Sequence, residues 1–158
     1  RQPGIPPRVP LLGGVNHGSG MSVRAIRIML VVAVIILVAY WTIWFTHRSW
    51  VESDTTAAYI AFENAFPLAD GWLGLTCLFA FIALGRRSPT ALLWLISAGA
   101  AGLYLFGMDV LYDLQNDIYG KGAGGVIEAA INLITLGFSL IALRWAWSRR
   151  DVLLAGGA

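Results

Sequence analysis

The chain is poor in charge, in cysteine and in histidine, and each shortage excludes a class of protein. Only 13% of its 158 residues are charged and 58% are hydrophobic, with a mean hydropathy of +0.69. Soluble domains carry about 25% charged and about 45–50% apolar residues, so this composition indicates an integral membrane protein. The lone thiol, Cys77, makes no intramolecular disulfide, which argues against a membrane dithiol oxidoreductase. With only His17 and His47 present, a haem held between two histidines is not expected.

Four apolar runs are long enough to cross a bilayer, which takes about 20 helical residues. They cover approximately 26–46, 66–84, 90–111 and 126–147. We therefore expect an all-α integral membrane protein, an up-down bundle of four transmembrane helices within residues 21–150, followed by a tail at 151–158. Residues 1–20 hold four of the six prolines and no periodic pattern, which favours a disordered extension or a sequence not native to the protein.

The basic residues predict the orientation of the bundle. Arginines flank the first span on its N-terminal side, the loop at 85–89 and the C-terminal end of the fourth span: Arg8, Arg24, Arg27, Arg86, Arg87, Arg144, Arg149 and Arg150. The opposite side holds only Arg48 and Lys121. Because cytoplasmic loops are enriched in Lys and Arg, we expect both termini in the cytoplasm and a multi-pass protein of the plasma (inner) membrane. The net charge of +2 is too small to suggest a nucleic-acid partner.

The acidic residues gather on the other, outward side. Eight of the nine lie there: Glu52, Asp54, Glu63, Asp70, Asp109, Asp113, Asp117 and Glu128. Negative charge has little influence on topology, so insertion does not explain this bias. Asp109, Asp113 and Asp117 recur every fourth residue, and with Tyr112 and Asn116 they would form one polar stripe on a helix.

The neighbouring spans carry matching groups at the same level. Glu63 and Asp70 belong to the second span and its approach, and Glu128 and Asn132 to the fourth. Asp70 and Asn132 lie about four and about six residues inside the span limits, where polar groups are costly and usually face the bundle interior. We therefore expect Asp70, Asp109 and Glu128 to share a polar pocket.

Simpler roles remain open for several of these residues. Asp113 and Asp117 suit a solvated helix end, and Glu128 suits the positive end of the fourth helix dipole. Asn132 could bridge helices by hydrogen bonding. His47, near the C-terminal end of the first helix, either complements the helix dipole or leans into the acidic pocket.

Oxygen ligands without cysteine suit hard cations, so Asp109 and Asp113 are candidate ligands for a divalent cation, and no other cofactor is evident. Their Asp-x-x-x-Asp spacing resembles part of the aspartate motifs with which prenyl- and phosphatidyl-transfer enzymes hold Mg²⁺. The glycine and arginine companions of those motifs are missing here, so no family follows from the spacing.

Three functions are compatible with this pattern, and the sequence names no reaction. The first is an outward-facing carboxylate-lined pocket that binds a cation or a cationic, amphipathic ligand. The second is a membrane-embedded enzyme doing acid–base chemistry on a lipid-like substrate, as in the sterol-isomerase-like four-helix group, which the chain resembles in architecture only. The third is an accessory subunit of a larger membrane complex. The lipid bilayer is the expected partner in each case, with a homo-oligomer as a further option.

Overall fold

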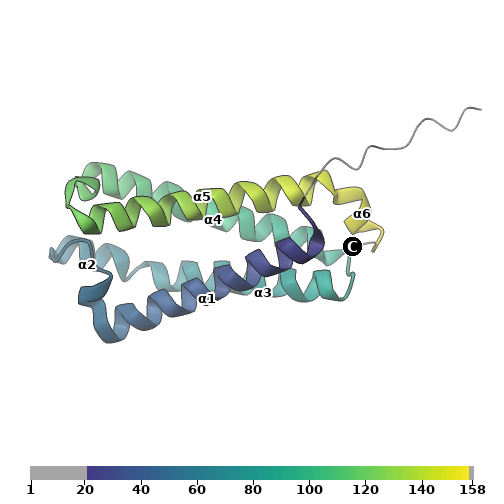
Figure 1. Ribbon diagram of the computed structural model, residues 1–158, viewed down its shortest axis with the longest axis horizontal. Coiled ribbons are helices and arrows are strands. Elements are labelled where there is room, and N and C mark those ends of the chain that lie inside the picture. The colour runs from purple at the N-terminus through teal and green to yellow at the C-terminus, as the bar shows by residue number, and fades with distance from the viewer. Residues whose placement is uncertain (1–20, 157–158) are drawn as a thin grey trace, which may run out of the picture.

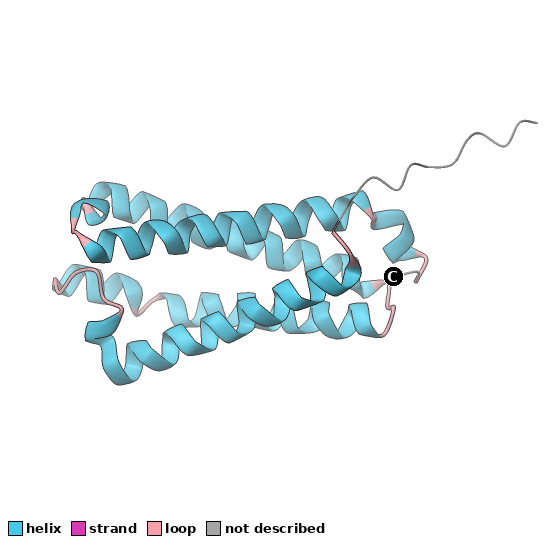
Figure 2. Ribbon diagram, viewed as in Figure 1, coloured by secondary structure: helices cyan, strands magenta, loops and turns pink. Residues whose placement is uncertain are grey.

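The computed structural model describes residues 21–156, which form helices joined by turns, with no strand among them. The elements are α1 (Val23–His47), η1 (Arg48–Trp50), α2 (Ala57–Glu63), α3 (Phe66–Gly85), α4 (Thr90–Gln115), η2 (Ile118–Gly120), α5 (Ala123–Ser148) and α6 (Arg150–Leu154). Short connections join them (Figure 2). The prediction of an all-helical chain is confirmed, while the expectation for residues 1–20 lies outside the described residues.

Four helical segments are long and apolar enough to cross a membrane: Val23–Trp50, Ala57–Gly85, Thr90–Gln115 and Ala123–Ser148. Each of the four sequence-predicted spans falls within one of them. The second segment combines α2 and α3, which meet at a turn before Pro67 near the start of α3. Proline is tolerated there because the first helical N–H groups have no intrahelical acceptor.

The long helices form an antiparallel bundle in which each packs on the next one along the chain (Figure 1). α1 packs on α3, α3 on α4, and α4 on α5. The bundle therefore has two distinct ends. The α2 end carries η1, α2 and η2, and the α6 end carries the start of α1, the α3–α4 turn and α6 (Figure 1). At the α6 end the indole Nε1 of Trp145 donates to the carbonyl oxygen of Met21 at 2.7 Å, which links α5 to the start of α1.

Two apolar clusters divide the length of the bundle. The larger one joins α1, α3, α4 and α5, and its buried members include Leu30, Leu73 and Leu105. The smaller one lies at the α2 end and centres on Trp44 and Tyr59. Much apolar surface faces outward instead, including Val38 on α1 and Leu133 on α5, which are 63% and 68% exposed. Outward-facing apolar surface on long helices is the arrangement that a lipid environment stabilises.

α4 and α5 pack closely together where α4 carries glycine. A Cβ on Gly99 would lie 2.6 Å from the Cγ of Leu143 and 3.1 Å from the carbonyl oxygen of Ser139. A Cβ on Gly102 would lie 2.3 Å from the Oγ of Ser139. Only glycine allows the two backbones to approach this closely, which is a common device in membrane helix pairs.

Substituting Gly99→Ala should therefore destabilise the bundle. The new methyl group meets a backbone carbonyl that cannot move away cheaply, and overpacking typically lowers the free energy of unfolding by about 1–3 kcal/mol. The matched control is Gly107→Ala on the same helix, where a Cβ has no neighbour within 4 Å. Unfolding by SDS titration in mixed micelles checks this. Equal stability of the two variants would contradict the close packing of α4 on α5.

Candidate functional site

Four carboxyl groups from four helices line one cavity between the two apolar clusters. The cavity has a volume of about 130 Å³ and is lined by Glu63 of α2, Asp70 of α3, Asp109 of α4 and Glu128 of α5. The remaining lining side chains are apolar or aromatic apart from Thr135, and no lysine, arginine or histidine is among them. We call this space the carboxyl cavity. Its negative groups have no basic side chain beside them in the wall.

Aromatic side chains of α1 donate hydrogen bonds to two of these carboxyls. The hydroxyl of Tyr40 donates to the Oε2 of Glu63 at 3.2 Å, and the indole Nε1 of Trp41 donates to the Oδ2 of Asp70 at 2.8 Å. Both rings also form part of the cavity wall. Hydrogen bonds from neutral donors orient a carboxylate without cancelling its charge, so the cavity stays negative wherever these groups are ionised.

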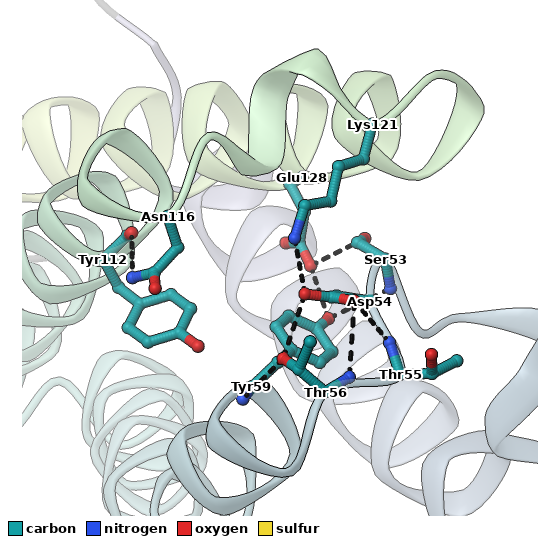
Figure 3. Close-up of polar contacts among 9 residues, drawn as sticks. All are labelled: Ser53, Asp54, Thr55, Thr56, Tyr59, Tyr112, Asn116, Lys121 and Glu128. Carbon is teal, nitrogen blue, oxygen red and sulfur yellow. Dashed lines mark hydrogen bonds and ion pairs between the residues drawn. The ribbon is translucent and has the colours of Figure 1, made fainter.

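Glu128 is held by Ser53, which precedes α2, and by Tyr59 of α2 (Figure 3). Its Oε1 accepts from the hydroxyl of Tyr59 at 2.8 Å and from the Oγ of Ser53 at 2.9 Å. The backbone N–H of Ser53 donates in turn to the hydroxyl of Tyr59 at 3.2 Å. Tyr59 is fully buried and Glu128 is 6% exposed. The predicted role of Glu128 at the positive end of the helix dipole is wrong, because α5 begins at Ala123 and has no acidic residue in its first turn. Glu128 lies in the second turn and is stabilised by these two hydrogen bonds instead.

Asp109 differs from the other three carboxyls. It is partly buried in the cavity wall, and its carboxyl group accepts no hydrogen bond from any residue in the described range 21–156. A carboxyl group that faces a partly closed space without a donor or a cation is the least compensated group in the cavity. It is therefore the group with most to gain from a bound cation or a proton.

The next aspartate along α4, Asp113, belongs to a separate network. The Nδ2 of Asn132 donates to the Oδ2 of Asp113 at 2.8 Å and lies 2.9 Å from the hydroxyl of Tyr119. Asp113 and Asn132 are 4% and 3% exposed. Burial, with a further contribution from the Asp113 charge, raises the pKa of Tyr119. The interpretation of Asp113 as a solvated helix end is therefore wrong, whereas the bridging role of Asn132 between α4 and α5 is confirmed.

Asp117 does not continue the predicted stripe. α4 ends at Gln115, and Asp117 lies beyond it with a left-handed φ of 52°, exposed to solvent. Its exposure fits the solvated alternative. The every-fourth-residue spacing thus spans three environments, with Asp109 in the cavity wall, Asp113 in a buried hydrogen-bond network and Asp117 at the surface.

Three further candidate residues lie outside the cavity wall. The ring of Tyr112 stacks on Phe62 with centroids 3.8 Å apart, and the Nδ2 of Asn116 donates to the Tyr112 carbonyl at 2.9 Å. His47 is exposed and packs on Trp50 at 4.6 Å between centroids. None of the three is among the cavity-lining residues.

An ion pair links two segments at the α2 end (Figure 3). The Nζ of Lys121 in the α4–α5 turn pairs with the Oδ2 of Asp54, and this hydrogen bond holds the pKa of Asp54 at about 2, below its usual value of 3.8. Next to it, Gly124 lies so close to Ser53 that an added Cβ would be 2.8 Å from the Ser53 Cα. The segment before α2 is thereby fastened to the start of α5.

The predicted metal ligands stand in different surroundings, because Asp109 faces the cavity and Asp113 is bonded to Asn132. Within residues 21–156, no group of three or more His, Cys, Asp or Glu side chains is placed to hold a metal ion. The divalent cation stays a prediction.

A second space adjoins the carboxyl cavity on one side. A groove of about 540 Å³ runs between α1 and α3 on the outer surface of the bundle, and its only charged lining residue is Asp70. Leu37, Trp41 and Asp70 line both spaces. The hydrogen bond between Trp41 and Asp70 therefore lies at the boundary between the groove and the cavity.

Sequence reasoning missed the donors to the carboxyls, which are Tyr40, Trp41, Ser53 and Tyr59. One signal was available, since Tyr40, Trp41 and Trp44 follow one another near the end of the first span at the depth of the acidic residues. Buried tyrosine and tryptophan need hydrogen-bond partners, and carboxylates of adjacent helices are suitable acceptors.

Comparison with known proteins gave no match. No family model matches the chain, and neither the curated proteins nor the solved structures include one similar enough to indicate its family.

The Asp54–Lys121 pair predicts a pH-dependent stability. Because the pKa of Asp54 is lower in the folded chain than its usual 3.8, the pair stabilises the fold above about pH 4 and loses this contribution as the pH falls towards 2. Asp54→Asn keeps an acceptor for the N–H groups of Thr55 and Thr56 but removes the charge. It should lower the melting temperature at pH 7, and the difference from the parent should vanish near pH 2.

Thermal unfolding between pH 2 and pH 7 measures this difference. Glu52→Gln is the matched control, because Glu52 is a neighbouring carboxylate that forms no ion pair within residues 21–156. A deficit of Asp54→Asn that is as large at pH 2 as at pH 7 would rule out the ion pair as its cause.

Proposed function

We propose that the chain is a four-span membrane protein with the α6 end in the cytoplasm, and that the carboxyl cavity binds a cation or the cationic group of an amphipathic ligand. Orientation rests on the arginines of the α6 end, which follow the positive-inside pattern. The plasma (inner) membrane is the proposed location. Binding rests on the single observation that four carboxyls share a wall without a basic residue.

The proposal follows from the free-energy cost of ionising carboxyl groups in a space with little water. Several carboxylates cannot all be ionised together at low cost when water is scarce. Either protons or a bound cation must compensate them. The rings of Tyr40 and Trp41 in the same wall favour an organic cation, because aromatic faces attract ammonium groups.

The volume of the cavity limits the size of the cationic group that it can bind. A volume of about 130 Å³ corresponds to roughly four water molecules at about 30 Å³ each, which suits a compact ammonium group. The adjoining apolar groove, with Asp70 at the boundary, suits an alkyl chain attached to that group. An amphipathic amine would thus place its charge at the carboxyls and its chain between α1 and α3.

Binding of decyltrimethylammonium to the protein in lipid nanodiscs tests the proposal. Asp70→Asn and Asp109→Asn should each weaken binding by about tenfold or more, since 1.4 kcal/mol of lost attraction is tenfold in affinity. The matched control, Asp117→Asn, makes the same chemical change at the exposed position after α4, and asparagine tolerates the left-handed backbone there. Radiolabelled ligand counted against empty nanodiscs gives the affinities.

Equal affinity of the parent, Asp70→Asn and Asp109→Asn would contradict the proposal. If Mg²⁺, Mn²⁺ or Ca²⁺ stabilises the parent and decyltrimethylammonium does not, the guest is a metal ion. Copurification of a larger protein, with binding of neither probe, would support the accessory-subunit alternative instead.

If the ligand enters through the groove between α1 and α3, a substitution of Trp41 should change its association rate. Trp41→Phe removes the Nε1 donor to Asp70 but keeps an aromatic wall, so the boundary between groove and cavity should open more readily. We expect decyltrimethylammonium to associate faster in this variant, whereas tetramethylammonium, which lacks a chain, should be less affected. Stopped-flow measurements on nanodiscs compare the two ligands. Unchanged association rates for both would argue for entry from the α2 end.

One observation favours acid–base chemistry on a lipid-like substrate as a second candidate. Asp109 accepts no hydrogen bond in the described part of the chain, while Glu128 in the same cavity accepts two. Unequal surroundings are what push a pair of carboxyls towards separate acid and base roles. Lipid turnover with a bell-shaped pH profile, abolished by Asp109→Asn, would establish this activity.

A further inference from the structure

The α6 end of the bundle has the opposite charge from the carboxyl cavity. Seven arginines lie there: Arg24, Arg27, Arg86, Arg87, Arg144, Arg149 and Arg150. The one carboxylate that the structure describes at this end, Asp151, pairs with Arg150 at 3.7 Å. Arg24 and Arg27 of α1 form no ion pair with any residue between 21 and 156. Their charge is available to a partner outside the chain.

Arg27 is held in place against α3 rather than extended into solvent. Its Cζ lies 4.4 Å from the ring centroid of Phe81, and its Nη2 approaches Gly85, where an added Cβ would be 3.3 Å away. Its Nε is shielded from solvent and has no hydrogen-bond acceptor among the described residues. A buried donor without an acceptor is costly, so the guanidinium is oriented but incompletely satisfied.

The space beside these two arginines is amphipathic. A pocket of about 300 Å³ is lined by Arg24, Arg27, Ile28, Val31, Val32 and Phe81. Val31 and Phe81 also line a second pocket of about 150 Å³ deeper along the contact between α1 and α3, whose walls are otherwise apolar apart from Cys77. α1 and α3 lie side by side along this path (Figure 1). Together the two pockets form an apolar slot between α1 and α3, with Arg24 and Arg27 at its entrance.

We propose that this slot binds an anionic phospholipid, with the phosphate at Arg24 and Arg27 and one acyl chain against Val31, Leu78 and Phe81. Guanidinium groups bind phosphate oxygens in bidentate fashion, and basic pockets between membrane helices take anionic headgroups. A phosphate in this pocket would pair with the guanidinium charges of Arg24 and Arg27. The site rests on the proposed membrane insertion but not on cation binding in the carboxyl cavity.

Charge complementarity favours an anionic phospholipid over bilayer lipids without net charge. The apolar slot accepts any acyl chain, but only an anionic headgroup compensates two unpaired arginines. A free phosphate would satisfy the charge and leave the apolar slot unused. Phosphatidylglycerol should therefore bind more tightly than phosphatidylcholine, and glycerol phosphate should not displace it.

Native mass spectrometry of the protein, released from micelles containing equal amounts of phosphatidylglycerol and phosphatidylcholine, measures retained lipid. The parent should retain phosphatidylglycerol in preference, and the double variant Arg24→Gln, Arg27→Gln should lose that preference by about tenfold. Arg144→Gln is the matched control, because Arg144 is exposed at the same end and lines neither pocket. It should retain the preference.

Three outcomes would overturn the site. Equal retention of the two lipids by the parent removes the headgroup preference, and an equal loss in Arg144→Gln assigns it to diffuse charge at the α6 end. Displacement by glycerol phosphate would also refute a lipid site.

If the double variant does not fold, phosphatidylglycerol carrying a photoreactive acyl chain is applied to the parent. Labelling should concentrate on Val31, Leu78 and Phe81, and even labelling of all four long helices contradicts the site.

Discussion

Four carboxyl groups in a cavity of about 130 Å³ form the constraint on which the α2 end depends. A chain with so few charged residues gathers four of them around one space without a neighbouring base. The surrounding structure supplies neutral donors to three of the four, from Tyr40, Trp41, Tyr59 and Ser53. These bonds fix the carboxyls in position and bring no positive charge to them, which is the condition that the proposed cationic ligand needs.

The rest of the bundle holds this arrangement from both sides. The close approach of α4 and α5 at Gly99 and Gly102 sets the separation of the helices that carry Asp109 and Glu128. The segment before α2 is fastened to the start of α5 through Asp54, Lys121 and Ser53, and Ser53 also bonds to Glu128 in the cavity wall. Towards the α1–α3 groove the boundary is formed by the side chains of Leu37, Trp41 and Asp70, and a hydrogen bond joins Trp41 to Asp70. Because the groove shares this boundary with the cavity, we propose that an amphipathic ligand enters the cavity from the side, between α1 and α3.

The sequence predicted the elements well and the cavity in part. Length and hydropathy suffice for four long helices, because a membrane-length apolar run has few alternatives to a helix. The depth of Asp70 and the helical spacing of Asp109 and Glu128 led to one shared space, and the structure brings these three side chains together with Glu63. The sequence could not assign Asp113, since a four-residue spacing keeps it close to the face of Asp109. Its burial depends on the contact with Asn132 across α5. The sequence also could not show that α4 ends at Gln115, before Asp117, so Asp117 does not continue the polar stripe.

Infrared difference spectroscopy of the protein in nanodiscs, recorded with and without decyltrimethylammonium, tests the central claim most directly because it observes the carboxyl groups themselves. If the carboxyl cavity binds the cation, its addition should change the carboxyl and carboxylate bands of the parent. The change should persist in Asp117→Asn and should be lost in the double variant Asp70→Asn, Asp109→Asn. Saturable binding of the ligand that leaves the carboxyl bands of the parent unchanged would contradict the account.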